Sequence, residues 1–299
     1  MRFFIFLIVA AVIAGYYYFP NKVTELFSFV SGAFNKTELV KPEALAEKAK
    51  AVVVEVKKEI VAPPPLRAIK ETPQAFLTQP GTIEWTNAQR TSNGLPPLAI
   101  NNQLNLAAEV KAKDMLSLQY FAHQSPAGAG PADLAKNFDY QYLIIGENLA
   151  LGNFKDDQAL VQAWMDSPGH RANILNSRYT EIGVAVLQGI YQGQRTWLAV
   201  QEFGRPLAIC PPISNDLKSK IESNETEIDR LQSELSAKKQ EIEESRSRGR
   251  GRGRFFEEEE RVNEYNQLAG IYNNLLNETK ILIGQYNEQV DKFNTCVAS

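Results

Sequence analysis

The pattern of apolar and polar positions divides the chain into segments of different character. Residues 3–19 form an unbroken apolar run after a single Arg2. Seventeen residues at about 1.5 Å each correspond to the short end of a bilayer-spanning helix, so we expect residues 1–20 to be a retained membrane anchor. A cleaved signal peptide is the alternative, because Ala14-Gly15 could serve as a small-residue cleavage site. With either a membrane anchor or a signal peptide, we expect the rest of the chain to lie outside the cytoplasm.

Residues 21–80 are expected to be a tether between the anchor and the next domain. Residues 41–61 have a helix-forming composition, whereas residues 62–80 contain five prolines and cannot form one regular element. We predict a short helix followed by a semi-rigid spacer.

Residues 81–206 carry the pattern of a globular domain. Helices are predicted over "TIEWTNAQRTSNG", where Gly94 supplies a left-handed cap, and over "DDQALVQAWMDSPGH". A third is predicted over "NNQLNLAAEVKAKDMLSLQ". Its apolar stripe consists of Leu104, Ala107, Ala108, Val110, Ala112, Met115 and Leu116. "EIGVAVLQGI" and "RTWLAVQEFG", separated by "YQGQ", predict a β-hairpin, and helices followed by strands indicate a layered α+β domain.

Residues 207–299 contain two heptad seams. Apolar positions alternate at spacings of four and three over residues 217–242 and again over residues 262–297. The seam positions are placed symmetrically about residues 253 and 254, so that Leu231 is matched with Leu276. A chain that reverses there forms an antiparallel coiled-coil hairpin.

The only two cysteines support this reversal. Cys210 and Cys296 lie almost symmetrically about the same midpoint, so the reversal that aligns the seams also brings the two sulfurs together. Because the chain is expected to be exported, we predict a disulfide between them.

The charge balance argues against nucleic acid as a partner. The chain has 32 basic and 35 acidic side chains and a net charge of -3, without the basic surface that nucleic acids or anionic membranes require. An Arg-Gly run at residues 246–254 is followed by four glutamates at residues 257–260. We interpret residues 246–260, the tip of the predicted hairpin, as a solvated loop in which the arginine and glutamate charges offset one another. Contact with an anionic surface polymer is the alternative.

The candidate chemistry is concentrated around the only two histidines. His123 follows a helix in "YFAHQSP", and His170 lies in the first turn of a helix in "WMDSPGHRANIL". Glu147 in "GENLA" and Asp166 before Ser167 add two carboxylates. These four side chains could converge on one pocket.

The motifs resemble a known family. "NAQRTSNGLPPL", "YFAHQSP", "GENLA", "WMDSPGHRANIL", "YTEIGVAV" and "WLAVQEFG" are similar in order and spacing to the bacterial branch of the CAP superfamily, which includes cysteine-rich secretory proteins, antigen 5 and pathogenesis-related (SCP-like) proteins. The resemblance covers residues 83–205. It implies an α-β-α sandwich with a surface cleft.

The resemblance also implies a cleft tetrad of His123, Glu147, Asp166 and His170. Asp166 stands where the family usually has Glu or, in the bacterial branch, often no acid. The family's animal and plant cysteine pairs are missing from this domain.

Three interpretations of the tetrad remain open. The residues could bind Zn²⁺ or another divalent cation, or His123, Glu147 and His170 could act as catalytic acids and bases. They could also satisfy one another as a buried polar network. Ser125 and Ser167 lie near the histidines, but such sequence proximity does not define a triad.

Several neighbouring residues are expected to have supporting roles. We expect Glu181 and Trp164 to support the fold and Arg171 and Asn173 to line or brace the cleft.

Together these features predict a membrane-anchored, extracytoplasmic CAP-domain protein at the cell surface or in the periplasm. Its expected role is that of a surface interaction module, with a cell-envelope or extracellular ligand in the cleft and a protein partner for the hairpin. The alternative is a metal-assisted hydrolase of peptide or cell-wall material.

Overall fold

The computed structural model describes residues 55–247 and 254–298. These residues form two compact units: residues 55–213 with 289–298, and the remainder of the C-terminal region. The predicted anchor at residues 1–20 lies outside the described residues. Within the described part of the chain, no helix is both long and apolar enough to cross a membrane.

The first unit is built on one sheet, and its central strands are antiparallel. Strand β6 (Gln194–Pro206) lies between β4 (Tyr142–Leu151) and β5 (Glu181–Tyr191). The predicted hairpin is confirmed as β5–β6, and its turn at Gln192 and Gly193 has φ values of 50° and 81°. Positive φ at both turn residues matches the right-handed twist of the flanking strands.

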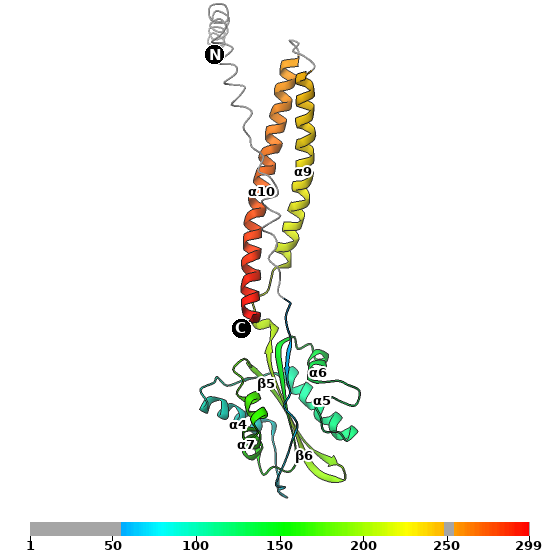
Figure 1. The fold of residues 1–299 in the computed structure, drawn as a ribbon, viewed down its shortest axis with the longest axis vertical. Helices are drawn as coiled ribbons and strands as arrows, with labels where there is room; N and C mark the ends of the chain where they lie inside the picture. Colours follow the sequence, from blue (N-terminus) through cyan, green and yellow to red (C-terminus); the bar gives the residue numbers. More distant parts are fainter. Residues whose placement is uncertain (1–54, 248–253, 299) are drawn as a thin grey trace, which may run out of the picture. The chain divides into compact units, whose positions relative to one another are not determined.

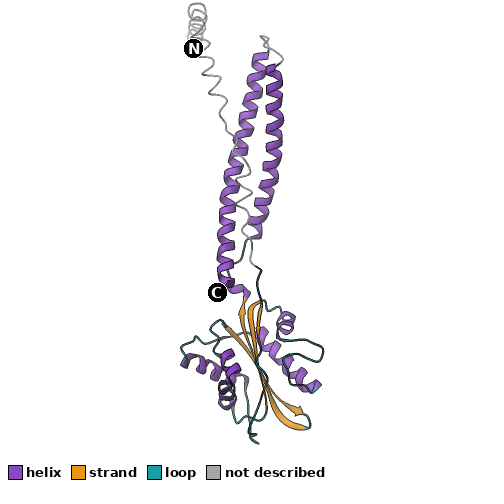
Figure 2. Cartoon of the chain, viewed as in Figure 1, coloured by secondary structure: helices purple, strands orange, loops and turns teal. Residues whose placement is uncertain are grey.

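Helices cover both faces of this sheet (Figure 1, Figure 2). Alternate β4 side chains explain the two layers, because Ile144 and Ala150 join one apolar cluster whereas Ile145 and Leu149 join clusters on the opposite face. The first layer consists of α4 (Gln79–Ser92), α7 (Asp157–Asp166) and α8 (Pro168–Ile174), and the second of α5 (Asn102–Leu118) and α6 (Pro131–Asn137). The predicted α-β-α layering is therefore present in the described residues.

The predicted helices agree with the structure, with one informative difference. Helix α4 is followed by Asn93 and by Gly94 at φ 76°, as the sequence indicated. In α5, however, Val110 is 41% exposed, and the next residue, Lys111, is 1% exposed. The apolar stripe of α5 therefore contains a buried lysine.

The predicted tether differs most from expectation. The end of the expected helix is strand β1 (Glu59–Val61), and the following Pro-rich chain forms β2 (Leu66–Arg67). Both pair in parallel with β4, on the edge opposite β6, and a further short strand, β3 (Ala99–Ile100), pairs with β5. We call residues 59–67 the strap. At least this part of the expected spacer is packed against the domain.

The second unit contains α9 (Asn215–Ser247) and all but the last ten residues of α10 (Arg254–Ala298). These two long helices run antiparallel (Figure 1). All buried α9 side chains lie on the predicted seam. They pack against α10 through the cluster Ile228, Leu231, Leu235, Ala269, Tyr272 and Leu276. Asn224 donates to Thr279 Oγ1 at 3.1 Å; the symmetry of the seams matches Asn224 with Ile283, one helical turn away. Supercoiling of the pair stays a prediction, and residues 248–253 of the Arg-Gly tip lie outside the described residues.

The predicted disulfide is confirmed. Cys210 follows the short 3₁₀ helix η1 (Leu207–Ile209), and its sulfur is bonded to that of Cys296 in the last turn of α10. The two Cα atoms are 5.6 Å apart, within the ordinary range for this bond.

Removing this bond should destabilise the protein. In the double variant Cys210→Ser/Cys296→Ser, the free energy of unfolding should fall by up to about 4 to 5 kcal/mol, because the unfolded chain regains the freedom of a long loop. Urea unfolding of the variant, compared with reduced and alkylated wild type, measures the effect. Equal midpoints for the variant and the oxidised wild type would contradict the prediction.

Candidate functional site

Two of the predicted site residues meet at the middle of β4. Glu147 lies on this strand with its side chain fully buried, and His123 lies in the loop after α5 with its side chain 15% exposed. His123 Nδ1 lies 2.5 Å from Glu147 Oε1. The third element is α8, whose first turn carries His170, and the charge of His123 acts on that residue.

The second ring nitrogen of His123 is occupied by the strap. Its Nε2 lies 2.5 Å from the carbonyl oxygen of Pro63. A carbonyl oxygen only accepts hydrogen bonds, so Nε2 must carry a hydrogen and donate it. Nδ1 shares a proton with the Glu147 carboxyl group. Both nitrogens of His123 are therefore engaged.

His170 is held as a buried neutral imidazole. Its Nδ1 lies 2.8 Å from Ser167 Oγ, and its buried Nε2 has no partner among the described residues. Burial, followed by the positive charge of His123, lowers the pKa of His170 to about 4. Ser167 occupies the N-cap position of α8, but its hydroxyl makes no capping hydrogen bond and contacts the imidazole instead.

No contact described for Asp166 joins it to His123, Glu147 or His170. It is exposed at the end of α7, where its Oδ1 accepts from Gln162 Nε2 at 2.8 Å, one turn earlier on the same helix. The sequence placed Asp166 in the tetrad through the resemblance, and the structure places its carboxylate on the outer face of α7.

A different acid faces Glu147. Glu202 on β6 is directly opposite Glu147 in the antiparallel register and is fully buried. Lys111 from α5 lies close to both, and its Nζ donates to the carbonyl oxygen of His123 at 2.5 Å. Sequence reasoning missed both residues, although each is a charged side chain on an otherwise apolar stripe or strand face.

Burial controls the ionisation of this cluster. It raises the pKa of Glu202 well above the ordinary value, and the neighbouring charge of Glu147 raises it further. Burial lowers the pKa of Lys111, opposed by the charges of Glu147, Glu202 and Asp114. A protonated Glu202 can donate to the otherwise unpartnered Glu147 Oε2, so that one proton serves two carboxyl groups.

Asn173 braces the opposite side of β4. Its amide donates to the Glu147 carbonyl at 3.2 Å and to Asn148 Oδ1 at 3.0 Å, and its own oxygen accepts from Tyr179. A Cβ atom at Gly146 would overlap the side chains of Tyr179 and Asn173. The glycine of "GENLA" is therefore required by the close packing of α8 and the following chain.

Other expected supporting roles agree with the described contacts. Glu181 accepts from Tyr140 and Asn101, and Trp164 is completely buried. Arg171 is exposed.

The residues in this arrangement do not fit a divalent cation. A metal-bound imidazole presents a nitrogen lone pair, but His123 Nε2 donates to Pro63. His170 Nε2 alone is unengaged, and Asp166 is on the outer face of α7. Residues 55–247 and 254–298 contain no group of three His, Cys, Asp or Glu side chains placed to hold a metal. The expected Zn²⁺ or other cation stays a prediction that requires rearrangement of the strap.

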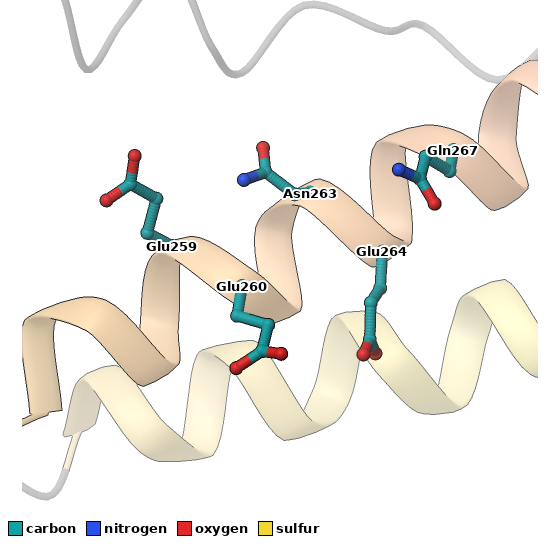
Figure 3. Close-up of a pocket in the computed structure, with 5 residues that line it drawn as sticks. All are labelled: Glu259, Glu260, Asn263, Glu264 and Gln267. Carbon is teal, nitrogen blue, oxygen red and sulfur yellow. The ribbon is translucent and has the colours of Figure 1, made fainter.

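A shallow pocket also occurs on α10. Figure 3 shows the side chains that line it, with Glu260 and Glu264 pointing toward α9. The lining residues are Glu259, Glu260, Asn263, Glu264 and Gln267. Glu264 is paired with Lys238 at 2.8 Å. Nothing else at this acidic strip indicates a ligand.

Comparisons with known proteins agree with the motif resemblance. Residues 83–203 match the model of the cysteine-rich secretory protein family, CAP. The uncharacterized protein YkwD of Bacillus subtilis is 45% identical over 106 residues, which cover 36% of this chain and 41% of that protein. The uncharacterized membrane protein YlbC of the same organism is 28% identical over 183 residues, covering 58% and 46%.

A solved structure shows the same kind of similarity. It is that of an extracellular protein containing an SCP domain from Bacillus anthracis, with 32% identity, a TM-score of 0.37 and coverage of 42% of this chain and 40% of that one. This chain spans less than half the length of these relatives. Residues 83–203 match the CAP family model, and this match together with the YkwD similarity supports a bacterial CAP superfamily domain in this part of the chain.

The buried His170 should make the protein sensitive to acid. Its pKa is about 4 in the folded state and about 6.5 when unfolded, so the unfolded state binds the proton first as the pH falls. Its contribution to stability is complete above pH 6.5 and decreases by about 3 kcal/mol toward pH 4. Urea unfolding of wild type and His170→Gln across this range measures the difference. Parallel stability curves would contradict it.

Glu202 should have the opposite effect. The pKa of Glu202 is higher in the folded state than in the unfolded state. Between these two pKa values the folded state keeps the proton and the unfolded state loses it. The free energy of unfolding therefore decreases as the pH rises toward the folded pKa. Glu202→Gln, which is permanently neutral, should therefore be more stable than wild type at pH 8, and the difference should shrink as the pH falls toward the ordinary pKa of a glutamate. Exposed Glu84→Gln on α4 is the control. A less stable Glu202→Gln protein at pH 8 would show that Glu202 is ionised.

Proposed function

We propose that this protein is an extracytoplasmic interaction module that is anchored to the membrane by residues 1–20 and binds a cell-envelope ligand through the CAP cleft. The observation that supports this most directly is the use of the cleft side chains. His123 and Asn173 direct their donors at backbone carbonyls of the strap, namely those of Pro63 and Val61. Side chains arranged in this way hold a polypeptide in place.

The membrane-anchored part of the proposal is supported by the sequence. The apolar run of residues 3–19 has the length of a short membrane helix, and a relative, YlbC, is named as a membrane protein. The intact disulfide fits an oxidising compartment outside the cytoplasm. The hairpin, with its charged outer surface, is then free to contact a protein partner.

A hydrolase acting on peptide or cell-wall material is the second candidate. The contact between Ser167 Oγ and His170 Nδ1 at 2.8 Å favours it, because a nucleophile next to a neutral base is the start of a catalytic dyad. The imidazole, however, lacks an acid on its other nitrogen among the described residues. In a Ser-His-Asp site such an acid orients the base.

A sedimentation assay separates the two candidates. The full chain in detergent is mixed with purified cell-envelope fragments, and both the bound protein and the soluble fragments released over time are measured. An interaction module binds without releasing fragments. Because His123 also holds the strap, the comparison is made in the variant Val61→Lys/Pro63→Lys, in which the strap is weakened. Adding His123→Ala to it should weaken binding at least ten-fold, whereas adding the control Asp166→Asn, altered at an exposed side chain, should leave binding unchanged.

Catalysis predicts a different result. Fragments would accumulate with wild type, and Ser167→Ala or His170→Ala would abolish their release. Fragment release of this kind would reject the interaction module in favour of the hydrolase. Equal binding by the strap-weakened protein with and without His123→Ala would remove the cleft from the interaction.

A further inference from the structure

The strap runs along one edge of the strand that carries Glu147 and pairs with it in two short ladders. Its residues Glu59–Val61 lie opposite Ile144–Gly146, and Leu66–Arg67 lie opposite Ala150–Leu151, in parallel register. The other edge of β4 is paired with β6. Without the strap, β4 would be an edge strand with unpaired backbone groups, which is the usual template for adding an extended chain.

The middle of the strap is built from prolines. Between the two short ladders, residues 62–65 pass beside Glu147–Leu149 as Ala-Pro-Pro-Pro. Proline has no N–H and cannot donate to a ladder, so the pairing is interrupted there. The β4 carbonyls of Glu147 and Leu149 instead accept from Asn173 and Trp164 side chains. The domain itself supplies the donors that the prolines lack.

Pro63 fits between the two helical layers. It is the one buried residue of the strap, and its carbonyl accepts from His123, on the α5 side of the sheet. On the α8 side it lies against Gly169, where a Cβ atom would come within 2.8 Å of the Pro63 Cβ. Gly169 therefore leaves space for a proline ring, and both Gly169 and His123 belong to motifs of the CAP domain.

The contacts to the strap recognise an extended backbone more than a particular sequence. The β4 ladders, His123 and Asn173 all bind main-chain groups. Val61 and Leu66 add apolar contact, and the guanidinium of Arg67, the last strap residue, lies over two aromatic rings. Five of the nine strap residues are exposed, and the ladders are only three and two residues long. Pairing of this length is weak by itself.

We propose that the β4 edge, His123 and α8 form a groove for an extended, proline-containing peptide of another polypeptide, and that the strap is the groove's intramolecular occupant. This proposal rests on the proposed interaction function and specifies its ligand class. Because the strap is tethered beside the groove, its effective concentration is in the millimolar range or above, on the scale of short flexible linkers. A peptide in solution therefore binds only when it displaces the strap or when the strap is weakened.

A strap-weakened variant tests the proposal directly. Val61→Lys/Pro63→Lys places two charges on the side of the strap that faces the groove. The matched control, Ala62→Lys/Pro64→Lys, places the same charges at exposed positions of the same segment. The probe is a fluorescein-labelled peptide with the sequence of residues 57–70, titrated into each full-length protein and followed by anisotropy. The first variant should bind it at least ten-fold more tightly than wild type or the control.

Changes in the peptide and in the groove complete the test. A peptide carrying the Val61→Lys/Pro63→Lys changes should lose binding at least ten-fold, whereas a peptide with the Ala62→Lys/Pro64→Lys changes should bind like the original. Adding His123→Ala to the strap-weakened protein should reduce binding at least ten-fold. Equal binding of the two altered peptides would overturn the proposal, because the groove would not distinguish the buried side of the ligand.

A second measurement on wild type decides the question if the strap-weakened variant does not fold. With millimolar peptide present, amides of Glu59–Val61 should exchange with solvent at least ten-fold faster, because the strap is displaced. Unchanged exchange at saturating peptide would overturn the proposal. Dimerisation of wild type with no peptide binding after strap weakening would also overturn it, in favour of strap exchange between copies.

The envelope assay and the peptide assay together distinguish a failure of the proposed interaction function from a failure of the proposed peptide ligand. Envelope binding that depends on His123, without any peptide binding by the strap-weakened protein, would reject the peptide ligand and leave the interaction function. Peptide binding without envelope binding would reject the envelope partner and retain the peptide groove.

Discussion

The backbone pairing of β4 on both edges is the constraint on which the site depends. β6 fixes one edge in antiparallel register and places Glu202 opposite Glu147, while the strap fixes the other edge and places the Pro63 carbonyl on His123. The side-chain chemistry is therefore set by main-chain geometry. Because hydrogen bonds to buried groups are costly to lose, each partner restricts the protonation state of the next. The imidazole of His123 donates to the strap and shares a proton with Glu147, which in turn faces the acid on β6.

The periodicity of the sequence predicted the regular elements well. Helices α4 and α5, the β5–β6 hairpin, the two long C-terminal helices and the disulfide all follow from local spacing, turn residues or symmetry about residue 253. The site was predicted in part. His123 and Glu147 do meet, and His170 lies in the first turn of α8 and senses the charge of His123. These positions were supplied by motifs, because no local spacing shows that residues so distant along the chain become neighbours.

The remaining features depend on long-range packing that local patterns do not encode. Residues 59–61 of the strap were predicted as the end of a helix, and residues 62–67 as part of a spacer, because the five prolines of residues 62–80 exclude one regular element. Those prolines do not exclude an edge strand whose missing donors are replaced by Asn173 and Trp164. Lys111 and Glu202 did leave a signal, since each is a charge at a position with apolar periodicity. Recognising from the sequence that these two residues belong to one cluster requires knowing that α5 packs over β6. For Asp166 the motif suggested a site residue, but its side chain is exposed and its described hydrogen bond is with Gln162.

The disulfide has a consequence for the covalent integrity of the C-terminal region. Cys210 precedes α9, and Cys296 lies in the last turn of α10. Any single backbone cleavage between these positions yields two polypeptides that remain joined through sulfur. A protease that cleaves the hairpin once therefore releases no fragment in an oxidising environment. The cleaved α10 segment stays attached to the CAP domain until the disulfide is reduced.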